Sequence, residues 1–508
     1  MAGSIIMRMR SIPRELWTAA QLRELDRRAI ELHGIPGREL MERAGAAAFD
    51  ALLRRWPASR SITVICGAGN NAGDGYVVAR RARREGLRVE TLAVVDPAAL
   101  HGDAAAACED FRREGGTPVA WNGDGPPQGD GPIVDALLGT GLDRALSGAF
   151  RAAVEAINAA SRPVLALDLP SGLHADTGRI MDAAVRAELT VSFIGLKLGL
   201  FTGRGPALVG QLVFAGLGVP ESVAEGLEPA ARRLEPAMLA DWLPLRPRDA
   251  HKGHFGHVLV IGGDTGLGGA ARLAGEAALR AGAGLVSVAT RPEHVGAILA
   301  ARPELMCRPV TTPEDLAPLL ERATVLAVGP GLGQSSWARG LLEFALAAEM
   351  PCVLDADALN LLAENPRRGQ RWILTPHPGE AGRLLGTDAT TVEADRPAAL
   401  RALRAACGGV VVLKGAGTLV GARSDTPWLC DRGNPGMASG GMGDVLTGLI
   451  AGLAAQIGDL ERAACAGVLV HALAADDAAR VGERGLVAGD LLQALRPWLN
   501  PLRADPTA

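Results

Sequence analysis

A glycine-rich stretch near the end of the chain has the residue types needed to hold a phosphate and to move a proton. Residues 434–444 have the sequence NPGMASGGMGD, and the apolar segment VLTGLI follows directly. We expect a loop that enters a buried helix, because glycines let backbone N–H groups approach a ligand closely. A helix N-terminus favours an anion, and Asp444 is placed there to deprotonate a hydroxyl as a phosphoryl group arrives. The structural alternative is an acidic residue that stabilises the first turn of a helix.

Lysine usage indicates further candidate positions. Only three of the 52 lysine and arginine residues are lysine, namely Lys197, Lys252 and Lys414, and each lies in a glycine-rich segment. We expect these lysines to serve a site, because a compact ammonium and a planar guanidinium are not interchangeable in tight surroundings. The alternative is a codon bias with three random exceptions. Lys414, followed by Gly-Ala-Gly-Thr, has the setting to hold a phosphate as a point charge.

Length and composition favour two to four domains of the α/β class. The chain has 508 residues with 65 glycines and 32 prolines, yet 48% of it is apolar, which suggests many short strand–loop–helix units. The formal net charge of −4 gives no electrostatic reason to expect nucleic acid or an anionic membrane as a partner. Seven scattered cysteines without a CxxC pair favour reduced thiols and a cytoplasmic location. No apolar run of 18 residues predicts a membrane span.

The first half alternates short apolar strands with helices, which predicts a parallel sheet with right-handed crossovers. Two helices, at residues 15–33 and 37–54, precede a strand at 61–66. A glycine-rich loop over residues 67–75 and a helix from Tyr76 to about residue 85 follow. Its glycine spacing is not GxGxxG, so a plain Rossmann dehydrogenase is disfavoured. Further elements are expected in the order strand 88–95, helix 101–114, strand 132–138, helix 147–160 and strand 163–169.

Polar clusters follow three of these strands, at the edge where parallel α/β sheets bind ligands. They are residues 70–74, Asp135 with residues 139–144, and Asp168 with Ser171. Asn71, Asp135 and Ser171 offer hard oxygen ligands, suited to an alkali or alkaline-earth cation, and Asp168 is a candidate acid/base. Each residue alone is a common helix cap or turn former. Three clusters at equivalent strand ends nevertheless favour a site.

The motifs GAGNNAGDGYVVAR, DALLGTGLDR and DLPSGLHADTG resemble those of the NAD(P)H-hydrate epimerase domain, the YjeF N-terminal family, over about residues 12–220. The resemblance implies a Rossmann-like three-layer αβα domain over residues 1–222, with Asp168 as catalytic acid/base. It also implies a potassium ion bound by Asn71, Asp135 and Ser171. The implied dinucleotide-binding residues are Asn70, Asn71, Ala72, Gly73, Asp74, Gly139, Thr140, Gly141, Leu142, Asp143, Arg144, Ala145 and Asp168.

Two positions depart from the pattern of that family. Ala72 stands where glycine is usual, so it must accept a conformation that glycine adopts more easily. His174 stands where aspartate is more usual. The resemblance assigns no role to His174 or to Tyr76.

A second α/β unit is predicted after a linker rich in Gly, Pro and Glu at residues 218–236. A strand at 257–263, an Ala-rich helix at 269–281 and a strand at 285–289 open it. Polar or glycine-rich segments recur at later strand ends, at residues 328–333, 354–360, 374–380 and 414–418. This pattern predicts a second open parallel sheet with a site at its edge. His377 lies between two prolines that hold it rigidly, and a structural histidine is the alternative.

The motifs HKGHFGHVLVIGG, AVGPGLG, VLDADALN, LTPHPGE, VVLKGAGT and GNPGMASGGMGD resemble the ADP/ATP-dependent NAD(P)H-hydrate dehydratase family over about residues 240–500. The resemblance implies a ribokinase-like α/β domain over residues 237–508, with Asp444 as the base, a Mg²⁺ ion, and ADP or ATP as co-substrate. It places Ala270, Gly331, His377 and Asp444 against the hydrated cofactor. The implied nucleotide-binding residues are Lys414, Gly415, Ala416, Gly417, Thr418, Asn434, Pro435, Gly436, Met437, Ala438, Ser439, Gly440, Gly441, Met442 and Gly443.

Together the two resemblances imply a fused enzyme that repairs hydrated NADH and NADPH, the substrates NADHX and NADPHX. The first domain would interconvert the R and S epimers. The second would phosphorylate the C6 hydroxyl of the S epimer, so that phosphate leaves, NAD(P)H is restored and AMP forms from ADP. A homo-oligomer is expected, without nucleic acid or membrane partners.

The sequence leaves open two alternatives to a repair enzyme, each from another class of protein. One is a ribokinase-like vitamin or sugar kinase with a regulatory N-terminal domain, which would release a stable phosphate ester. The other is a non-enzymatic scaffold or RNA-binding module, against which the retained Asp168, Asn71 and Asp135 argue.

Overall fold

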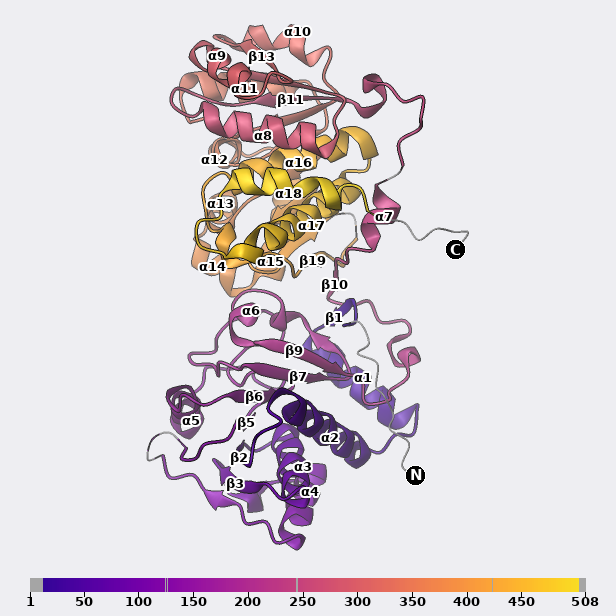
Figure 1. Cartoon of the computed structure of the whole chain (residues 1–508), viewed down its shortest axis with the longest axis vertical. Coiled ribbons are helices and arrows are strands. Elements are labelled where there is room, and N and C mark those ends of the chain that lie inside the picture. Colours follow the sequence, from indigo (N-terminus) through magenta and orange to yellow (C-terminus); the bar gives the residue numbers. More distant parts are fainter. Residues whose placement is uncertain (1–11, 124, 126, 244, 423, 502–508) are drawn as a thin grey trace. The chain divides into compact units, whose positions relative to one another are not determined.

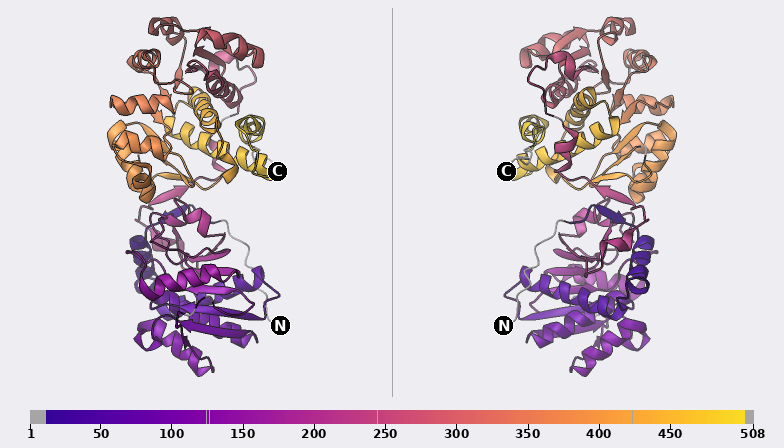
Figure 2. Two further views of the ribbon diagram at one scale, coloured as in Figure 1. Left: turned by 90° about the vertical axis from the view of Figure 1, so that its left-hand side faces the viewer. Right: turned by 90° about the vertical axis from the view of Figure 1, so that its right-hand side faces the viewer.

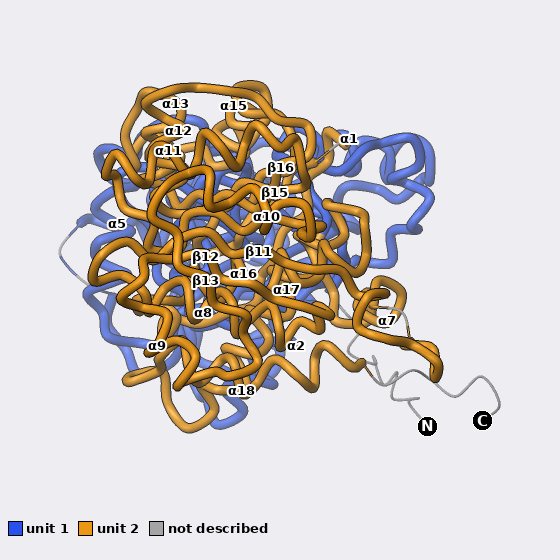
Figure 3. The backbone as a smooth tube through the Cα atoms, turned by 90° about the horizontal axis from the view of Figure 1, so that it is seen from above, with its two compact units in different colours: residues 1–232 blue, residues 233–508 orange. Residues whose placement is uncertain are grey.

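The structure is a computed structural model that describes residues 12–123, 125, 127–243, 245–422 and 424–501. Contacts divide the chain into two compact units, unit 1 up to Arg232 and unit 2 from Arg233 onward (Figure 3). The segment predicted as a linker contains a short 3₁₀ helix, Glu221–Ala224, and the strand β10 (Ala231–Arg233). The functional domain limits 1–222 and 237–508 stay a prediction.

Unit 1 is built on a seven-stranded sheet with the order β4-β3-β2-β5-β6-β7-β9, in which every pairing is parallel (Figure 1). Its strands are β2 (Ser61–Cys66), β3 (Arg88–Ala93), β4 (Val119–Ala120), β5 (Ile133–Ala136), β6 (Val164–Leu167), β7 (Leu189–Phe193) and β9 (Gln211–Ala215). Its helices are α1 (Ala19–Glu31), α2 (Gly37–Arg55), α3 (Asn70–Arg84), α4 (Gly102–Arg113), α5 (Gly148–Ala159) and α6 (Gly205–Leu208). A short strand, β1 (Glu15–Trp17), pairs with β10 and with β8 (Leu196–Lys197).

Both faces of the unit 1 sheet are covered by helices. Successive residues of β2 point to opposite sides: Val64 packs in a cluster with α1 to α4, and Ile65 packs in a cluster with α5. A parallel sheet buried on both faces is typical of doubly wound α/β folds. The predicted three-layer arrangement is therefore confirmed.

The helix predicted at residues 15–33 is wrong at its start, because Glu15–Trp17 form strand β1. Helix α1 begins at Ala19, where Thr18 provides a capping box. The Gln21 N–H donates to Thr18 Oγ1 (3.2 Å), and the Thr18 N–H donates to the Gln21 side chain (3.0 Å). These reciprocal bonds satisfy donors that a helix start leaves free.

The glycine-rich loop predicted at residues 67–75 is also wrong, because α3 begins at Asn70. Gly73 and Gly75 are helical residues that allow close packing. A Cβ atom on Gly73 would lie 2.5 Å from Met41 Sδ, and one on Gly75 would lie 2.5 Å from Ala136 Cβ. Ala72 consequently has ordinary helical geometry, so the expected need for a glycine-like conformation there is wrong.

Unit 2 has a sheet with the order β13-β12-β11-β14-β15-β16-β17-β18-β19, parallel from β13 to β17 and antiparallel from β17 to β19 (Figures 1 and 2). The strands are β11 (His257–Ile261), β12 (Leu285–Thr290), β13 (Met306–Pro309), β14 (Val325–Val328), β15 (Cys352–Leu354), β16 (Trp372–Leu374), β17 (Val410–Leu413), β18 (Thr418–Gly421) and β19 (Trp428–Cys430). Val258 and Leu259, on opposite faces of β11, are both fully buried. The predicted second parallel sheet is confirmed.

The helices of unit 2 surround this sheet. They are α7 (Met238–Trp242), α8 (Gly268–Ala281), α9 (Pro292–Ala301), α10 (Ala317–Leu320), α11 (Ser336–Ala347), α12 (Asp357–Glu364), α13 (Pro378–Leu385), α14 (Ala389–Ala394), α15 (Arg396–Cys407), α16 (Met442–Ile457), α17 (Leu460–Ala478) and α18 (Ala488–Trp498). Helix α16 packs closely on α8, since a Cβ on Gly448 would lie 1.9 Å from the carbonyl oxygen of Ala274. Small residues thus fix the helix that carries Asp444.

Two further features concern the thiols of the chain and a possible membrane span. All seven cysteines are free and buried. Within the part of the chain that the structure describes, no helix is long and apolar enough to cross a membrane.

Candidate active sites

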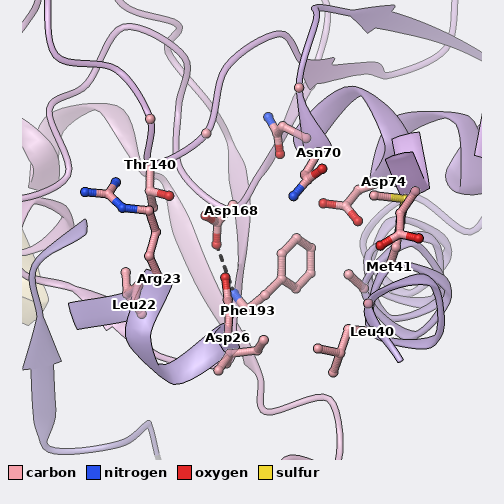
Figure 4. Close-up of a pocket in the computed structure, with 18 of the residues that line it drawn as sticks. Leu22, Arg23, Asp26, Leu40, Met41, Asn70, Asp74, Thr140, Asp168 and Phe193 are labelled. Atoms are coloured by element: carbon pink, nitrogen blue, oxygen red, sulfur yellow. Dashed lines mark hydrogen bonds between the residues drawn. The ribbon is translucent and has the colours of Figure 1, made fainter. Parts of the chain in front are cut away.

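Unit 1 contains a cavity of about 480 Å³ at the ends of β5, β6 and β7 (Figure 4). The predicted site residues that line it are Asn70, Asn71, Asp74, Gly139, Thr140, Gly141, Leu142 and Asp168. The predicted residues that do not line it are Ala72 and Gly73, buried in the packing of α3, and the exposed residues Asp143, Arg144 and Ala145. The sequence prediction missed Asp26, Phe193 and Lys197 as lining residues, although the rarity of lysine had singled out Lys197.

Asp168 has a constrained backbone at the end of β6. Its φ angle of 68° lies in the left-handed region, which is uncommon outside glycine and often marks functional sites. Its Oδ1 accepts a hydrogen bond from the Phe193 N–H (3.2 Å) and another from Lys197 Nζ. Lys197, 2% exposed, also donates to Ser192 Oγ (3.1 Å) and to the Phe193 carbonyl (3.2 Å). Asp168 is therefore an oriented carboxyl group beside a buried ammonium.

The predicted cation ligands are Asp135 and Ser171, which are hydrogen-bonded to each other, and Asn71, which lines the cavity and whose Cβ lies 3.7 Å from a Cβ placed on Gly139. Asp135 is fully buried, and its two oxygens accept hydrogen bonds from Ser171 Oγ (2.6 Å) and the Ser171 N–H (2.8 Å). Burial raises the pKa of Asp135 to about 6, although the bonds from Ser171 act to lower it. Asn71 is also buried, and neither its amide oxygen nor its amide nitrogen has a hydrogen-bond partner in the described ranges. A hard cation would neutralise the buried carboxylate and give the Asn71 oxygen a partner.

In unit 2, Asp444 lies in the first turn of α16, as predicted from the sequence. The helix starts after Gly441, whose φ of 88° requires the freedom of glycine. Burial and the charge of Asp355 raise the pKa of Asp444 to about 6, although Lys414 acts to lower it. A carboxylate with such a pKa is well suited to act as a general base near neutral pH.

Asp355, at the end of β15, connects the elements of the unit 2 site. It is 1% exposed and accepts hydrogen bonds from Lys414 Nζ (2.7 Å) and Thr447 Oγ1 (2.7 Å). Burial alone would raise the pKa of Asp355, but the charge of Lys414 and these hydrogen bonds lower it. Burial alone would lower the pKa of Lys414, but Asp355 and Glu380 raise it above its ordinary value. Lys414, predicted to hold a phosphate, thus has its ammonium directed at Asp355.

Further residues of unit 2 lie near the ion pair of Lys414 and Asp355. Two other predicted residues are neighbours of each other. A Cβ on Gly443 would lie 3.4 Å from Lys414 Nζ, and Glu380 Oε2 lies 3.7 Å from the same atom. Burial raises the pKa of Glu380 to about 7. A Cβ on Gly331 would lie 3.1 Å from Ala270 Cβ, so these two residues are neighbours.

Several predicted ligand residues also have a local structural task. His377 caps α13, where its Nδ1 accepts the Gly379 N–H (3.0 Å), so the structural alternative describes its present contacts. Asn434 Oδ1 accepts the Gly436 N–H (3.0 Å), and its Nδ2 donates to Asp476 (3.1 Å), which ties the glycine-rich loop to α17. The remaining loop residues, from Pro435 to Gly440, lead from this anchor to α16.

Three residues singled out from the sequence lie apart from the proposed chemistry. Lys252 is exposed in a short 3₁₀ helix, and its predicted role in a site stays a prediction. His174 Nδ1 accepts the N–H groups of Asp176 and Thr177 (3.3 Å each) in a turn. Tyr76 is fully buried and packs against Phe111.

Two α/β units, each with acidic side chains beside a buried or half-buried lysine at strand ends, are the arrangement of an enzyme with two candidate sites. The family described as NAD(P)H-hydrate dehydratase matches residues 258–497, and the family described as YjeF-related protein N-terminus matches residues 37–199. The Nnr bifunctional NAD(P)H-hydrate repair enzyme of Coxiella burnetii is 50% identical over 493 residues, covering 96% of this chain and 99% of the relative. The Escherichia coli enzyme of that description is 46% identical, covering 97% and 96%. The chain belongs to the family of bifunctional NAD(P)H-hydrate repair enzymes.

Solved structures similar to part of the chain include two bacterial proteins. An ADP/ATP-dependent NAD(P)H-hydrate dehydratase from Bacillus subtilis, co-crystallised with ATP and Mg²⁺, is 30% identical and covers 51% of this chain and 95% of its own, with a TM-score of 0.47. A ribokinase-like superfamily protein from Enterococcus faecalis is 32% identical and covers 53% and 95%, with a TM-score of 0.49. With the family established, the predicted repair function, enzyme class and α/β fold classes are confirmed. The alternatives of a vitamin or sugar kinase and of a non-enzymatic scaffold are excluded.

Proposed function

We propose that unit 1 interconverts the R and S epimers of NADHX and NADPHX, and that unit 2 dehydrates the S epimer with ADP or ATP as phosphoryl donor. The observation that carries the proposal is the position of Asp444. This carboxyl group lies at the N-terminus of α16, beside Lys414 but without a hydrogen-bond donor of its own among the described residues. It is therefore free to accept a proton where a phosphate would bind.

In unit 2, Asp444 takes the proton of the C6 hydroxyl as the phosphoryl group is transferred to that oxygen. The N–H groups at the start of α16 and in the loops at residues 415–418 and 434–441 stabilise the phosphate charge. Lys414, held by Asp355, supplies a fixed positive charge. The ring nitrogen lone pair then expels phosphate, a proton leaves C5, and NAD(P)H is restored. With ADP as donor the second product is AMP.

We expect the predicted Mg²⁺ of unit 2 to be carried mainly by the phosphates of the nucleotide. Within the described residues, no group of three or more His, Cys, Asp or Glu side chains is arranged to hold a metal ion. Magnesium in phosphoryl-transfer enzymes is commonly bound by substrate phosphates with few protein ligands. The steps that Asp444 and Lys414 perform do not depend on this Mg²⁺ ion.

In unit 1, Asp168 acts as acid/base at C6 of the nicotinamide ring, and Lys197 fixes its orientation. The residues that would hold the predicted potassium ion are Asn71, Asp135 and Ser171. A cation bound there supplies positive charge at the strand ends and a site for a substrate oxygen. The exposed residues Asp143, Arg144 and Ala145 would contact the adenosine part of the dinucleotide, outside the cavity.

Two further expectations remain proposals for this chain. We place the enzyme in the cytoplasm, which agrees with seven free cysteines, and we expect a homo-oligomer.

The test uses purified protein and acid-treated NADH, which contains both epimers of the hydrate. Added ADP or ATP should restore the NADH absorbance at about 340 nm, with release of one phosphate for each NADH formed. Wild-type protein should convert the whole pool, whereas Asp168→Asn should convert the S epimer rapidly and the R epimer only at its uncatalysed rate. A hydrate pool left unrepaired by wild-type protein would overturn the proposal.

A further inference from the structure

Asp74 is a buried acid in the unit 1 cavity that has no partner. Its side chain lies on α3, lines the cavity and is 9% exposed. No hydrogen bond or ion pair involves it within the described ranges. Buried polar groups are nearly always hydrogen-bonded, so an unpartnered carboxyl group that faces a cavity indicates a ligand that completes it.

Asp74 and Asp168 enter the same cavity from different elements. Figure 4 shows Asp74 and Asp168 on different sides of the cavity, with the Asp74 carboxyl group directed into it and the Asp168 carboxyl group directed along the hydrogen bond drawn as a dashed line. Asp168 accepts hydrogen bonds from the Phe193 N–H and from Lys197, which hold its carboxyl group in one orientation. Asp74 has no donor, and burial without donors favours the neutral acid.

The charges around Asp74 act in the same direction. Burial raises the pKa of Asp74 well above its ordinary value, and the negative charges of Asp168 and Asp26 raise it further. Lys197 is the charged group that lowers it. Arg23 and Asp103 also line the cavity. The cavity thus holds one carboxyl group with hydrogen-bond donors, Asp168, and one without, Asp74, an arrangement that acid–base catalysis can use.

We propose that Asp74 is a second catalytic residue of unit 1, which serves one face of the nicotinamide ring while Asp168 serves the other. This inference rests on the epimerase activity proposed for unit 1. It differs from a single-residue mechanism in which one carboxyl group serves both the departure and the return of water.

The proposed step moves one proton across the site. Asp74 gives its proton to the C6 hydroxyl, the C6–O bond breaks, and the ring nitrogen lone pair forms an N1=C6 double bond as water leaves. A water molecule on the opposite face then bonds to C6, the electron pair returns to N1, and that water gives a proton to Asp168. The two carboxyl groups end with exchanged protonation states, so the site is set for the opposite epimer or is reset by exchange with solvent.

The experiment measures epimerisation and oxygen exchange at C6 with each purified epimer in ¹⁸O-labelled water, using full-length protein and a blank without enzyme. For Asp74→Asn we expect the kcat of epimerisation to fall by about 10²-fold or more, with KM changed by less than about threefold. In Asp74→Asn, exchange of ¹⁸O at C6 with retained configuration should persist for one epimer only. In Asp168→Asn, this exchange should persist for the other epimer only.

The matched control is Asp50→Asn, the same change at an exposed acidic residue of α2 that does not line the cavity, which should epimerise at the wild-type rate. Unchanged dehydratase activity in unit 2 and an unchanged Tm would show that the Asp74→Asn protein is folded. Epimerisation by Asp74→Asn at the wild-type rate, or equal loss of exchange for both epimers, would overturn the inference and leave the proposed function intact. Wild-type protein without any epimerase activity would overturn the proposed function itself.

Discussion

The active sites of units 1 and 2 both place a lysine beside acidic side chains at strand ends, but they connect these groups differently. In unit 1, Lys197 donates directly to Asp168, the proposed acid/base. In unit 2, Lys414 donates to Asp355, and the proposed base Asp444 is left without a donor in the described residues. Asp444, which has no donor, has a raised pKa and can take up a proton, whereas Asp168 is held in a fixed orientation by the ammonium of Lys197. A lysine–aspartate ion pair thus contains the proposed reacting carboxyl group in unit 1. In unit 2 the ion pair lies beside the proposed reacting carboxyl group.

The largest expected effect separates the two sites by activity. Asp444→Asn should lower the dehydratase kcat by about 10²–10⁴-fold, because the amide cannot accept the hydroxyl proton. Epimerisation should stay within about twofold of wild type, since unit 1 has its own site. Separate assays of phosphate release and of epimer ratio check this result, and loss of both activities would contradict the two-site comparison.

Replacing Lys414 and replacing Lys197 should lower the free energy of unfolding by different amounts. Lys414→Met leaves Asp355, which is 1% exposed, as an uncompensated buried charge, and should lower the free energy of unfolding of unit 2 by about 3–5 kcal/mol. Lys197→Met leaves Asp168, whose side chain is 17% exposed, with water as an alternative donor. Its effect on unit 1 should be about 1–3 kcal/mol. Denaturant unfolding followed for each unit tests this order, and the reverse order would contradict the contrast between the two pairs.

The pH dependence of dehydration should reflect the free carboxyl group of unit 2. The pKa of Asp444 is raised to about 6, so the base becomes protonated as the pH falls through that value. The dehydratase kcat/KM should then fall by about tenfold for each pH unit below about 6. Initial rates between pH 4.5 and 8 at saturating nucleotide provide the measurement, with stability at each pH as the control. A flat profile down to pH 5 would remove Asp444 from the role of base.

The smallest expected effect comes from the monovalent cation. Exchanging potassium for tetramethylammonium should lower epimerisation and leave dehydration unchanged, because only unit 1 has the Asn71, Asp135 and Ser171 oxygen set. Potassium should also raise the Tm of unit 1, as a ligand that binds the folded state does. Asn71→Leu should abolish this shift in Tm. An equal effect of the exchange on both activities would count against the assigned ligands.

Local patterns in the sequence predicted most elements but not all of their limits. The strand at residues 61–66 has the expected bounds, because it is a buried apolar run that ends at Gly67. The start of α3 was misplaced because glycine was interpreted as a turn residue. At Gly73 and Gly75 the close approach of Met41 and Ala136 explains the glycines, and both partners are distant in the sequence.

The sequence by itself determined the family, the two α/β units and most residues of the two sites, because spaced motifs at strand ends depend on local chain chemistry. Only the tertiary structure decided which of these residues touch. Asp355 is joined to Lys414 and Thr447, which lie 59 and 92 residues away, and Lys197 reaches Asp168 from 29 residues away. Asp74 and Asp168 likewise lie far apart in the chain and share one cavity. Protonation depends on burial and on neighbouring charges, which exist only after the strands and helices are brought together.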